Sequence, residues 1–139
     1  MTDAERGGAV VEFVLLGALL LVPVVYFVLT VGTLQGASYA AAGAADHAAK
    51  IFVRAADPAS ARANAEASVS LAMSDFAMDA SAWTMSVACD RQACLEAGAV
   101  VTVTVDVDVS LPLAPDLGSG PLRAARIGAS ASQVVGRFR

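Results

Sequence analysis

The feature that most constrains this chain is an apolar run of membrane length near its N-terminal end, preceded by one acidic residue. Residues 13–31 contain only three residues that are neither aliphatic nor aromatic, and no charged residue occurs between Glu12 and Asp46. A helix over this run would rise roughly 28 Å, which is close to the hydrocarbon thickness of a bilayer. Because a core helix in a chain of 139 residues rarely needs so long an uncharged stretch, the run predicts a membrane-embedded helix.

Composition and charge limit the partners. Hydrophobic residues make up 57% of the chain, and its formal net charge is −4. A negatively charged chain without a basic stripe and interleaved aromatic residues does not suit nucleic acid, so no nucleic-acid partner is expected. The basic residues near the C-terminal end are expected to form a solvated edge; they are Arg123, Arg126, Arg137 and Arg139.

Three segments follow from the distribution of charge and apolar residues. Residues 1–7 are expected to form a short polar leader, residues 8–56 a transmembrane and stalk helix, and residues 57–139 an extracytoplasmic α+β domain. The long helix is expected to begin near Gly8. It should continue past the membrane, because residues 38–56 are rich in alanine and contain no proline.

A second helix is predicted from Asp57 and Pro58, an N-cap type of residue followed by proline at the first helical position. It is expected to cover about residues 58–79. Apolar residues recur there at helical spacing and predict one core-facing stripe, made of Ala65, Val69, Met73 and Phe76.

The pattern then changes to period two. Residues 100–110 read VVTVTVDVDVS, in which valine alternates with polar residues, and this predicts a strand with one buried face. Similar alternation predicts an earlier strand around residues 83–87 and a less regular third strand over about residues 122–135. The predicted fold class is therefore α+β, with a long N-terminal transmembrane and stalk helix, a second helix and a small three-stranded antiparallel sheet.

Cys89 and Cys94 are the two cysteines of the chain and lie in the sequence CDRQAC. Their proximity suggests a disulfide, which would add on the order of 2 kcal/mol and would indicate an oxidising compartment. Free thiols or half of a metal site are the alternatives. Because zinc usually takes four ligands and the chain has one histidine, neither a metal nor another cofactor is expected.

Few residue patterns in the sequence point to catalysis. The sequence has no supported Ser-His-Asp set and no glycine-rich phosphate loop between a strand and a helix, so no enzymatic activity and no catalytic residue is expected. Asp106 and Asp108 share one strand face, where they are expected to aid solubility and to block pairing at an edge-like strand. His47 is expected on a solvated helix face.

Glu12 is the residue that an ordinary anchor leaves unexplained. A charged side chain at the centre of a bilayer costs roughly 2.5–3.5 kcal/mol on insertion scales, and less near the edge. Either Glu12 lies at the headgroup level and has no role, or the charge serves a purpose within the membrane. The residues before it bear on this choice.

The sequence Gly7-Gly8-Ala9-Val10-Val11-Glu12-Phe13 resembles the processing site of type IV prepilin-like proteins, and its G-x4-E-F form is similar to that of the tight-adherence (Flp) branch. The resemblance implies that residues 1–7 are a prepilin-type leader and that a prepilin peptidase cuts between Gly7 and Gly8 on the cytoplasmic side. Glu12 would then be the fifth residue of the mature protein and would pair with the freed N-terminal amine of a neighbouring subunit, with Phe13 beside it in the assembly motif.

Since the chain continues for over eighty residues past this helix, it resembles the TadE-like minor pseudopilins more than the short major pilins. This implies a structural subunit in pilus biogenesis and adhesion. The implied partners are the prepilin peptidase, other pilin or pseudopilin subunits, the membrane platform of the assembly system and the lipid bilayer. The N-terminus would be cytoplasmic, and the C-terminal domain would lie outside the cytoplasm, where it could join a surface pilus.

Two other interpretations remain open from the sequence. One is an unprocessed, signal-anchored extracytoplasmic domain in which Glu12 is incidental. The other is a small secreted protein, cut at small residues such as Ala42-Gly43-Ala44. A secretory signal usually has an apolar stretch of 7 to 15 residues after a positively charged segment, and this chain has neither feature.

Overall fold

The computed structural model describes residues 6–114 and 122–137, and it confirms the predicted α+β class. Residues 1–5 of the expected leader, most of the proline- and glycine-rich segment before the third strand, and Arg139 lie outside the described residues. The elements in chain order are α1 (Arg6–Phe52), α2 (Pro58–Asp75), the 3-10 turn η1 (Ala80–Ala82), β1 (Trp83–Cys89), β2 (Val100–Ser110) and β3 (Arg123–Val134).

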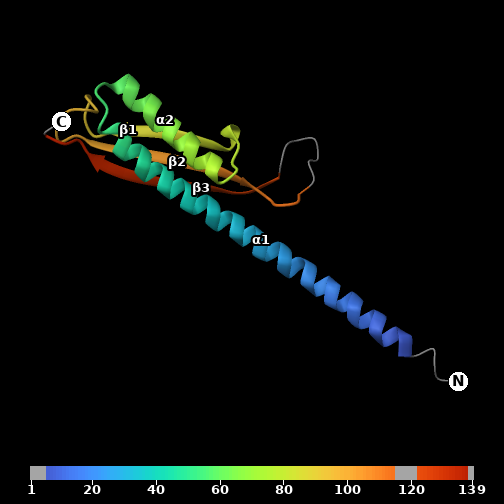
Figure 1. The fold of residues 1–139 in the computed structure, drawn as a ribbon. Coiled ribbons are helices and arrows are strands. Elements are labelled where there is room, and N and C mark those ends of the chain that lie inside the picture. Colours follow the sequence, from blue (N-terminus) through green and yellow to red (C-terminus); the bar gives the residue numbers. More distant parts are fainter. Residues whose placement is uncertain (1–5, 115–121, 138–139) are drawn as a thin grey trace.

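Helix α1 is a single helix of 47 residues that continues through Pro23. It begins at Arg6, two residues before the predicted start. Figure 1 shows that its N-terminal half projects away from the rest of the molecule, whereas its C-terminal half packs against α2 and the sheet. We call residues 8–33 the arm, and residues 34–114 and 122–137 the body.

Within the body, α1 presents an alanine face to the core. These small side chains allow the backbone of α1 to approach both α2 and the sheet closely, and Phe52 closes the far end of the contact. The buried residues of this face are Ala37, Ala40, Ala41, Ala44, Ala45, Ala48, Ala49 and Phe52.

Helix α2 begins where the sequence predicts. The Asp57 carboxylate accepts hydrogen bonds from the backbone N–H groups of Ala59 (3.0 Å) and Ser60 (2.9 Å), and Pro58 opens the helix. These bonds satisfy two N–H groups that have no partner within the helix. The Ser60 hydroxyl also donates to the second Asp57 oxygen at 2.7 Å, so the cap is a closed local network.

The predicted end of α2 was too late by four residues. The helix ends at Asp75, because Ala77 adopts a left-handed conformation (φ 54°) and the N–H groups of Ala77 and Met78 turn back to the carbonyls of Ser74 and Met73. This is a Schellman ending with alanine at the position where glycine is favoured. The predicted core stripe is buried at Ala65, Val69 and Met73, but Phe76 lies beyond the last turn and remains 49% exposed.

The sheet has the order β1-β2-β3, and both strand pairs are antiparallel. Strand β2 is therefore central, and the prediction that Asp106 and Asp108 protect an edge strand was wrong. Asp108 instead forms ion pairs with Arg123 (3.0 Å) and Arg126 (3.8 Å) of β3. Gly128 of β3 lies opposite Asp106, and a β-carbon there would come within 2.6 Å of an Asp106 carboxylate oxygen.

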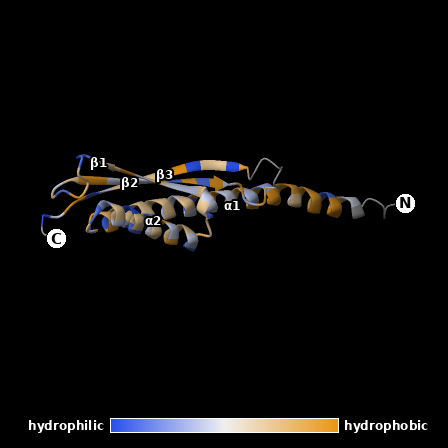
Figure 2. Ribbon diagram, turned by 90° about the horizontal axis from the view of Figure 1, so that it is seen from above, coloured by the Kyte–Doolittle hydropathy of each residue, from blue (hydrophilic) through white to orange (hydrophobic). Residues whose placement is uncertain are grey.

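One face of the sheet carries the core and the other is exposed. The β2 valines are buried, whereas the inward residues of β1 and β3 are only partly covered. Both helices lie on the same side of the sheet, as Figure 2 shows, so the body has two layers. The buried strand residues are Val101, Val103, Val105, Val107 and Val109.

The predicted disulfide is confirmed. Cys89 ends β1, Cys94 lies in the connection to β2, and their Cα atoms are 5.4 Å apart. The same connection is held to the sheet by the Asp90 carboxylate, which accepts from the Val100 N–H at 2.8 Å. The end of the hairpin farthest from the arm is thus closed by both a covalent and a polar link.

Candidate functional site

The apolar run predicted to enter a membrane lies on the arm, where no part of the body covers it. None of its most apolar 18-residue window is buried, and Phe13 is 77% exposed. The helix is long and apolar enough to cross a membrane by length and composition. Figure 2 colours most of the ribbon of the arm as hydrophobic. An arm of this kind needs a lipid or protein environment, because exposed apolar patches of this size are rare on soluble proteins.

The arm passes directly into the body. Leu29 is 45% exposed, Leu34 packs against the core, and Ala37 is 1% exposed. The change from a free to a covered helix surface therefore takes about two turns and follows the end of the apolar run at Val31. Because no linker separates the two parts, a membrane around the arm would lie against the base of the body.

Glu12 lies on the exposed arm, one helical turn after Gly8, so the two residues share a helix face. No described side chain forms an ion pair or a hydrogen bond with Glu12. Phe13 follows on a neighbouring face and is also exposed. The assembly residues expected from the sequence are thus free of the chain's own body, and no described residue of this chain neutralises Glu12.

Gly7 and Gly8 lie in the first turn of α1. A β-carbon at Gly8 would meet nothing within 4 Å, so packing in this chain does not require glycine there. Each glycine lowers helix stability by about 1 kcal/mol relative to alanine, and the first N–H groups of a helix lack internal partners. The peptide bond between the two glycines can therefore leave the helical conformation at low cost.

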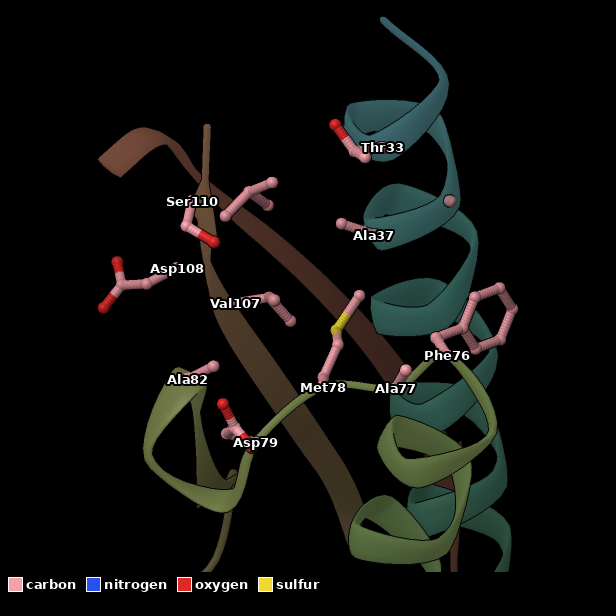
Figure 3. Close-up of a pocket in the computed structure, with 12 residues that line it drawn as sticks. Thr33, Ala37, Phe76, Ala77, Met78, Asp79, Ala82, Val107, Asp108 and Ser110 are labelled. Carbon is pink, nitrogen blue, oxygen red and sulfur yellow. The ribbon is translucent and has the colours of Figure 1, made fainter. Parts of the chain in front are cut away.

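A hollow of about 290 Å³ lies where the body meets the arm (Figure 3). Its walls come from α1 at Thr33 and Ala37, from the segment after α2 at Phe76 and Met78, and from the end of β2. Ser110 and Thr33 face the same space. The sequence did not reveal this hollow, because its lining comes from three separate segments that meet only in the fold.

The other candidate groups do not converge on one site. His47 is exposed, and Lys50, which follows it on α1, forms an ion pair with Asp46 at 2.6 Å. Across residues 6–114 and 122–137, no three residues of the His, Cys, Asp and Glu types come together as a metal site. Asp108 is held by Arg123 and Arg126, which accounts for its position by local ion pairing.

Comparison of the chain with protein-family models, with curated proteins and with solved structures finds no match. The resemblance at residues 7–13 thus stands on the motif alone. The features of the chain that bear on function are the arm, the position of Glu12 on it and the body at its end.

Proposed function

We propose that this chain is a minor pseudopilin of the tight-adherence type, cut after Gly7 and acting as an assembly subunit in pilus biogenesis and adhesion. The observation that carries the proposal is the arm: an uncovered apolar helix on which Glu12 has no ion-pair partner among the described residues and lies one turn after an easily unwound glycine pair. An anchor needs the apolar surface only. The carboxylate and the glycines need a further reason, and processing followed by assembly supplies one.

Cleavage would create an amine at Gly8. In a bundle of arms, the ammonium group of one subunit can lie beside the Glu12 carboxylate of the next and neutralise it. An isolated charge is expensive among apolar helices, and a pair is tolerated when its geometry is good. Only one axial offset between neighbouring arms places the two groups together. The charge would therefore select the register of assembly more than it would add stability.

The body would lie outside the cytoplasm, where its disulfide can persist. The arm would remain in the bilayer until assembly removes it. The partners in this proposal are the prepilin peptidase, other pilin subunits and a membrane platform that moves the arm out of the lipid. The outer face of the sheet, which carries serine and threonine together with aspartate and arginine, would be left for contacts outside the membrane.

The secreted interpretation meets a physical objection. Cleavage within residues 42–44 would remove Ala37, Ala40 and Ala41, which are buried in the core of the body at 0–2% exposure. The product would lack the part of α1 that covers the end of the sheet nearest the arm. An unprocessed anchor avoids this objection, and the experiment below distinguishes it from a pseudopilin.

The test is the mature N-terminus of the full chain expressed with its own peptidase, measured by intact mass and N-terminal sequencing of the membrane fraction. We expect a new N-terminus at Gly8. Gly7→Ala should keep the chain in the membrane uncut. The matched variant Gly17→Ala should be cut normally, because Gly17 lies outside the cleavage motif and a β-carbon there would meet nothing within 4 Å. Normal trimming of Gly7→Ala would contradict the proposal. So would an uncut wild type beside a peptidase that cleaves another substrate.

A further inference from the structure

Three leucines lie at the end of the body nearest the arm. Leu111 and Leu113 follow β2, and Leu122 precedes β3. The Leu111 N–H donates to the Leu122 carbonyl at 2.8 Å, so the two segments are held side by side. Leu113 is 84% exposed and Leu122 is 43% exposed. We call Leu111, Leu113 and Leu122 the leucine tip.

The backbone at Leu113 makes this exposure unusual. Its φ of 59° lies in the left-handed region, which glycine adopts without penalty and a bulky side chain adopts rarely. A turn that faced only water would be expected to carry glycine or asparagine there. The fold therefore holds a leucine side chain outward at a position where neither the backbone nor the core benefits from it.

The residues that line the hollow show which part of α1 the leucine tip lies beside. Ser110, the last residue of β2, lines the hollow together with Thr33 of α1 (Figure 3). Figure 1 shows that β2 runs toward the arm. Three further residues extend the chain by up to about 10 Å, which corresponds to at most about seven residues of helix. Leu113 therefore lies level with residues 26–33 of α1, where the apolar run ends.

Basic side chains lie one step farther from the arm. Arg123 pairs with Ser110 across the sheet, and its side chain is 70% exposed although it is bound to Asp108. Arg126 follows toward the middle of β3 and shares the same carboxylate. Asp106 lies two residues before Asp108 on the same face of β2, so the two arginines and two aspartates together carry no net charge, and the 70% exposed Arg123 is the guanidinium nearest the end of the strand. Leucine at the tip with arginine behind it matches the order of acyl chain and phosphate in a bilayer.

We propose that the leucine tip inserts into the membrane interface beside the arm and that Arg123 lies at the level of the lipid phosphates. The base of the body is thus a lipid-binding surface, and the chain is attached to the bilayer at two points. This inference rests on the membrane anchoring in the proposed function. Attachment at a second point would fix the tilt of the body on the membrane, which a single helix followed by a free domain would not.

The proposal can be tested with the full chain in phospholipid vesicles that contain lipids brominated along the acyl chain. Trp83→Phe removes the native indole, and single indoles are then introduced at chosen leucines. Leu122→Trp reports on the tip while Leu113 stays native. Leu21→Trp reports on the arm, and Leu71→Trp is the matched control, because Leu71 is an exposed leucine of α2 (67%) away from the base.

We expect strong quenching for Leu21→Trp, quenching by bromines near the headgroup for Leu122→Trp, and little quenching for Leu71→Trp. Adding Leu113→Gly should then reduce the bilayer-inserted fraction of the tip roughly tenfold, which is the usual effect of removing one leucine from an apolar phase. Glycine suits the left-handed backbone at this position, so the body should remain folded, as circular dichroism can confirm.

Each contrary outcome is informative. If the arm indole is quenched and the tip indole resembles the Leu71→Trp control, the inference is wrong while the membrane anchor stands. Without quenching of the arm indole, the anchor fails and the inference fails with it. If the tip indole is shielded from aqueous iodide only at high protein-to-lipid ratios, its partner is a neighbouring subunit and the lipid-binding surface is refuted.

Discussion

Removing the disulfide is expected to destabilise the body by about 2 kcal/mol. Cys89 and Cys94 are separated by five positions, so the bond closes a loop of six residues. The chain-entropy relation for a loop of this size gives about 2 kcal/mol at 25 °C. A domain of about one hundred residues has a total stability of roughly 5–15 kcal/mol, and such a loss would lower its melting temperature by about 10 °C.

The assay is denaturant unfolding of the full chain in detergent micelles, followed by the fluorescence of Trp83. This residue is the single tryptophan of the chain, begins β1 and packs partly against the core, so it reports on the body and not on the arm. The variant is Cys89→Ser with Cys94→Ser. The matched control is the wild type under reducing conditions, which should lose the same stability, whereas the double variant should not respond to reductant.

A loss below about 0.5 kcal/mol would refute the reasoning, because the loop would then be constrained without the bond. The polar link from Asp90 to Val100 is the element that could supply such a constraint. A loss above about 4 kcal/mol would also refute the reasoning, because it would exceed what the chain-entropy relation allows for so short a loop. It would show that the two sulfur atoms, which lie against the core cluster, contribute mainly by packing.

Three further predictions concern single residues. Glu12→Gln should leave membrane insertion and cleavage intact but reduce co-purification with other pilin subunits, and Glu66→Gln on α2 is the matched control; unchanged co-purification would remove the assembly role of Glu12. Ala77→Gly should raise the free energy of unfolding by about 0.5–1 kcal/mol in denaturant titration, because glycine adopts the left-handed φ of 54° without strain. A lower free energy of unfolding would contradict this, and would mean that the greater freedom of glycine in the unfolded chain outweighs the strain removed from the folded one. Hydrogen bonds from the Ser60 side chain and backbone hold the pKa of Asp57 below its ordinary value of 3.8. The stabilisation of the fold by the ionised Asp57 cap is therefore complete above about pH 4 and falls as the pH drops through the lowered pKa. Asp57→Asn should lose less stability over that acidic range than the wild type, and identical plots of unfolding free energy against pH would contradict the capping argument.

The sheet and helix order could be predicted because they depend on local patterns. Strict alternation of valine with polar residues gave the bounds of β2, and Asp57 with Pro58 gave the start of α2. Both patterns act within a few residues, since side-chain direction and capping are set by neighbouring backbone. The disulfide was predictable for a similar reason: Cys89 and Cys94 are close in sequence and have few alternative partners.

Features that depend on where a helix stops or on the order of the strands were not predicted. Phe76 continues the helical spacing of α2, but a left-handed residue after it ends the helix and exposes its ring. The position of Asp106 and Asp108 on a central strand required knowledge of the strand order, which alternation does not contain. The exposure of Leu113 near the arm could not be predicted either, because it depends on how β2 is placed beside α1.

Along the arm, the candidate assembly residues could be named from sequence because they interact with nothing in the body. Gly8 has no contact that would require glycine, and Glu12 has no described partner. A motif whose residues are unused by the fold is explained more readily by a partner outside the chain. Residues such as Asp57, in contrast, have their chemical role fully satisfied by local hydrogen bonds.

Helix α1 also shows how one apolar helix can serve two environments. Its arm is built from leucine, valine and phenylalanine, whereas its body half is built from alanine. Large side chains provide the surface that lipid or neighbouring arms would cover, but they would hold the helix away from its own sheet. Alanine permits the close approach that buries the β2 valines. The change in side-chain size between Leu34 and Ala37 therefore marks the level at which the chain turns from external partners to its own core, and the leucine tip lies on the arm side of that level.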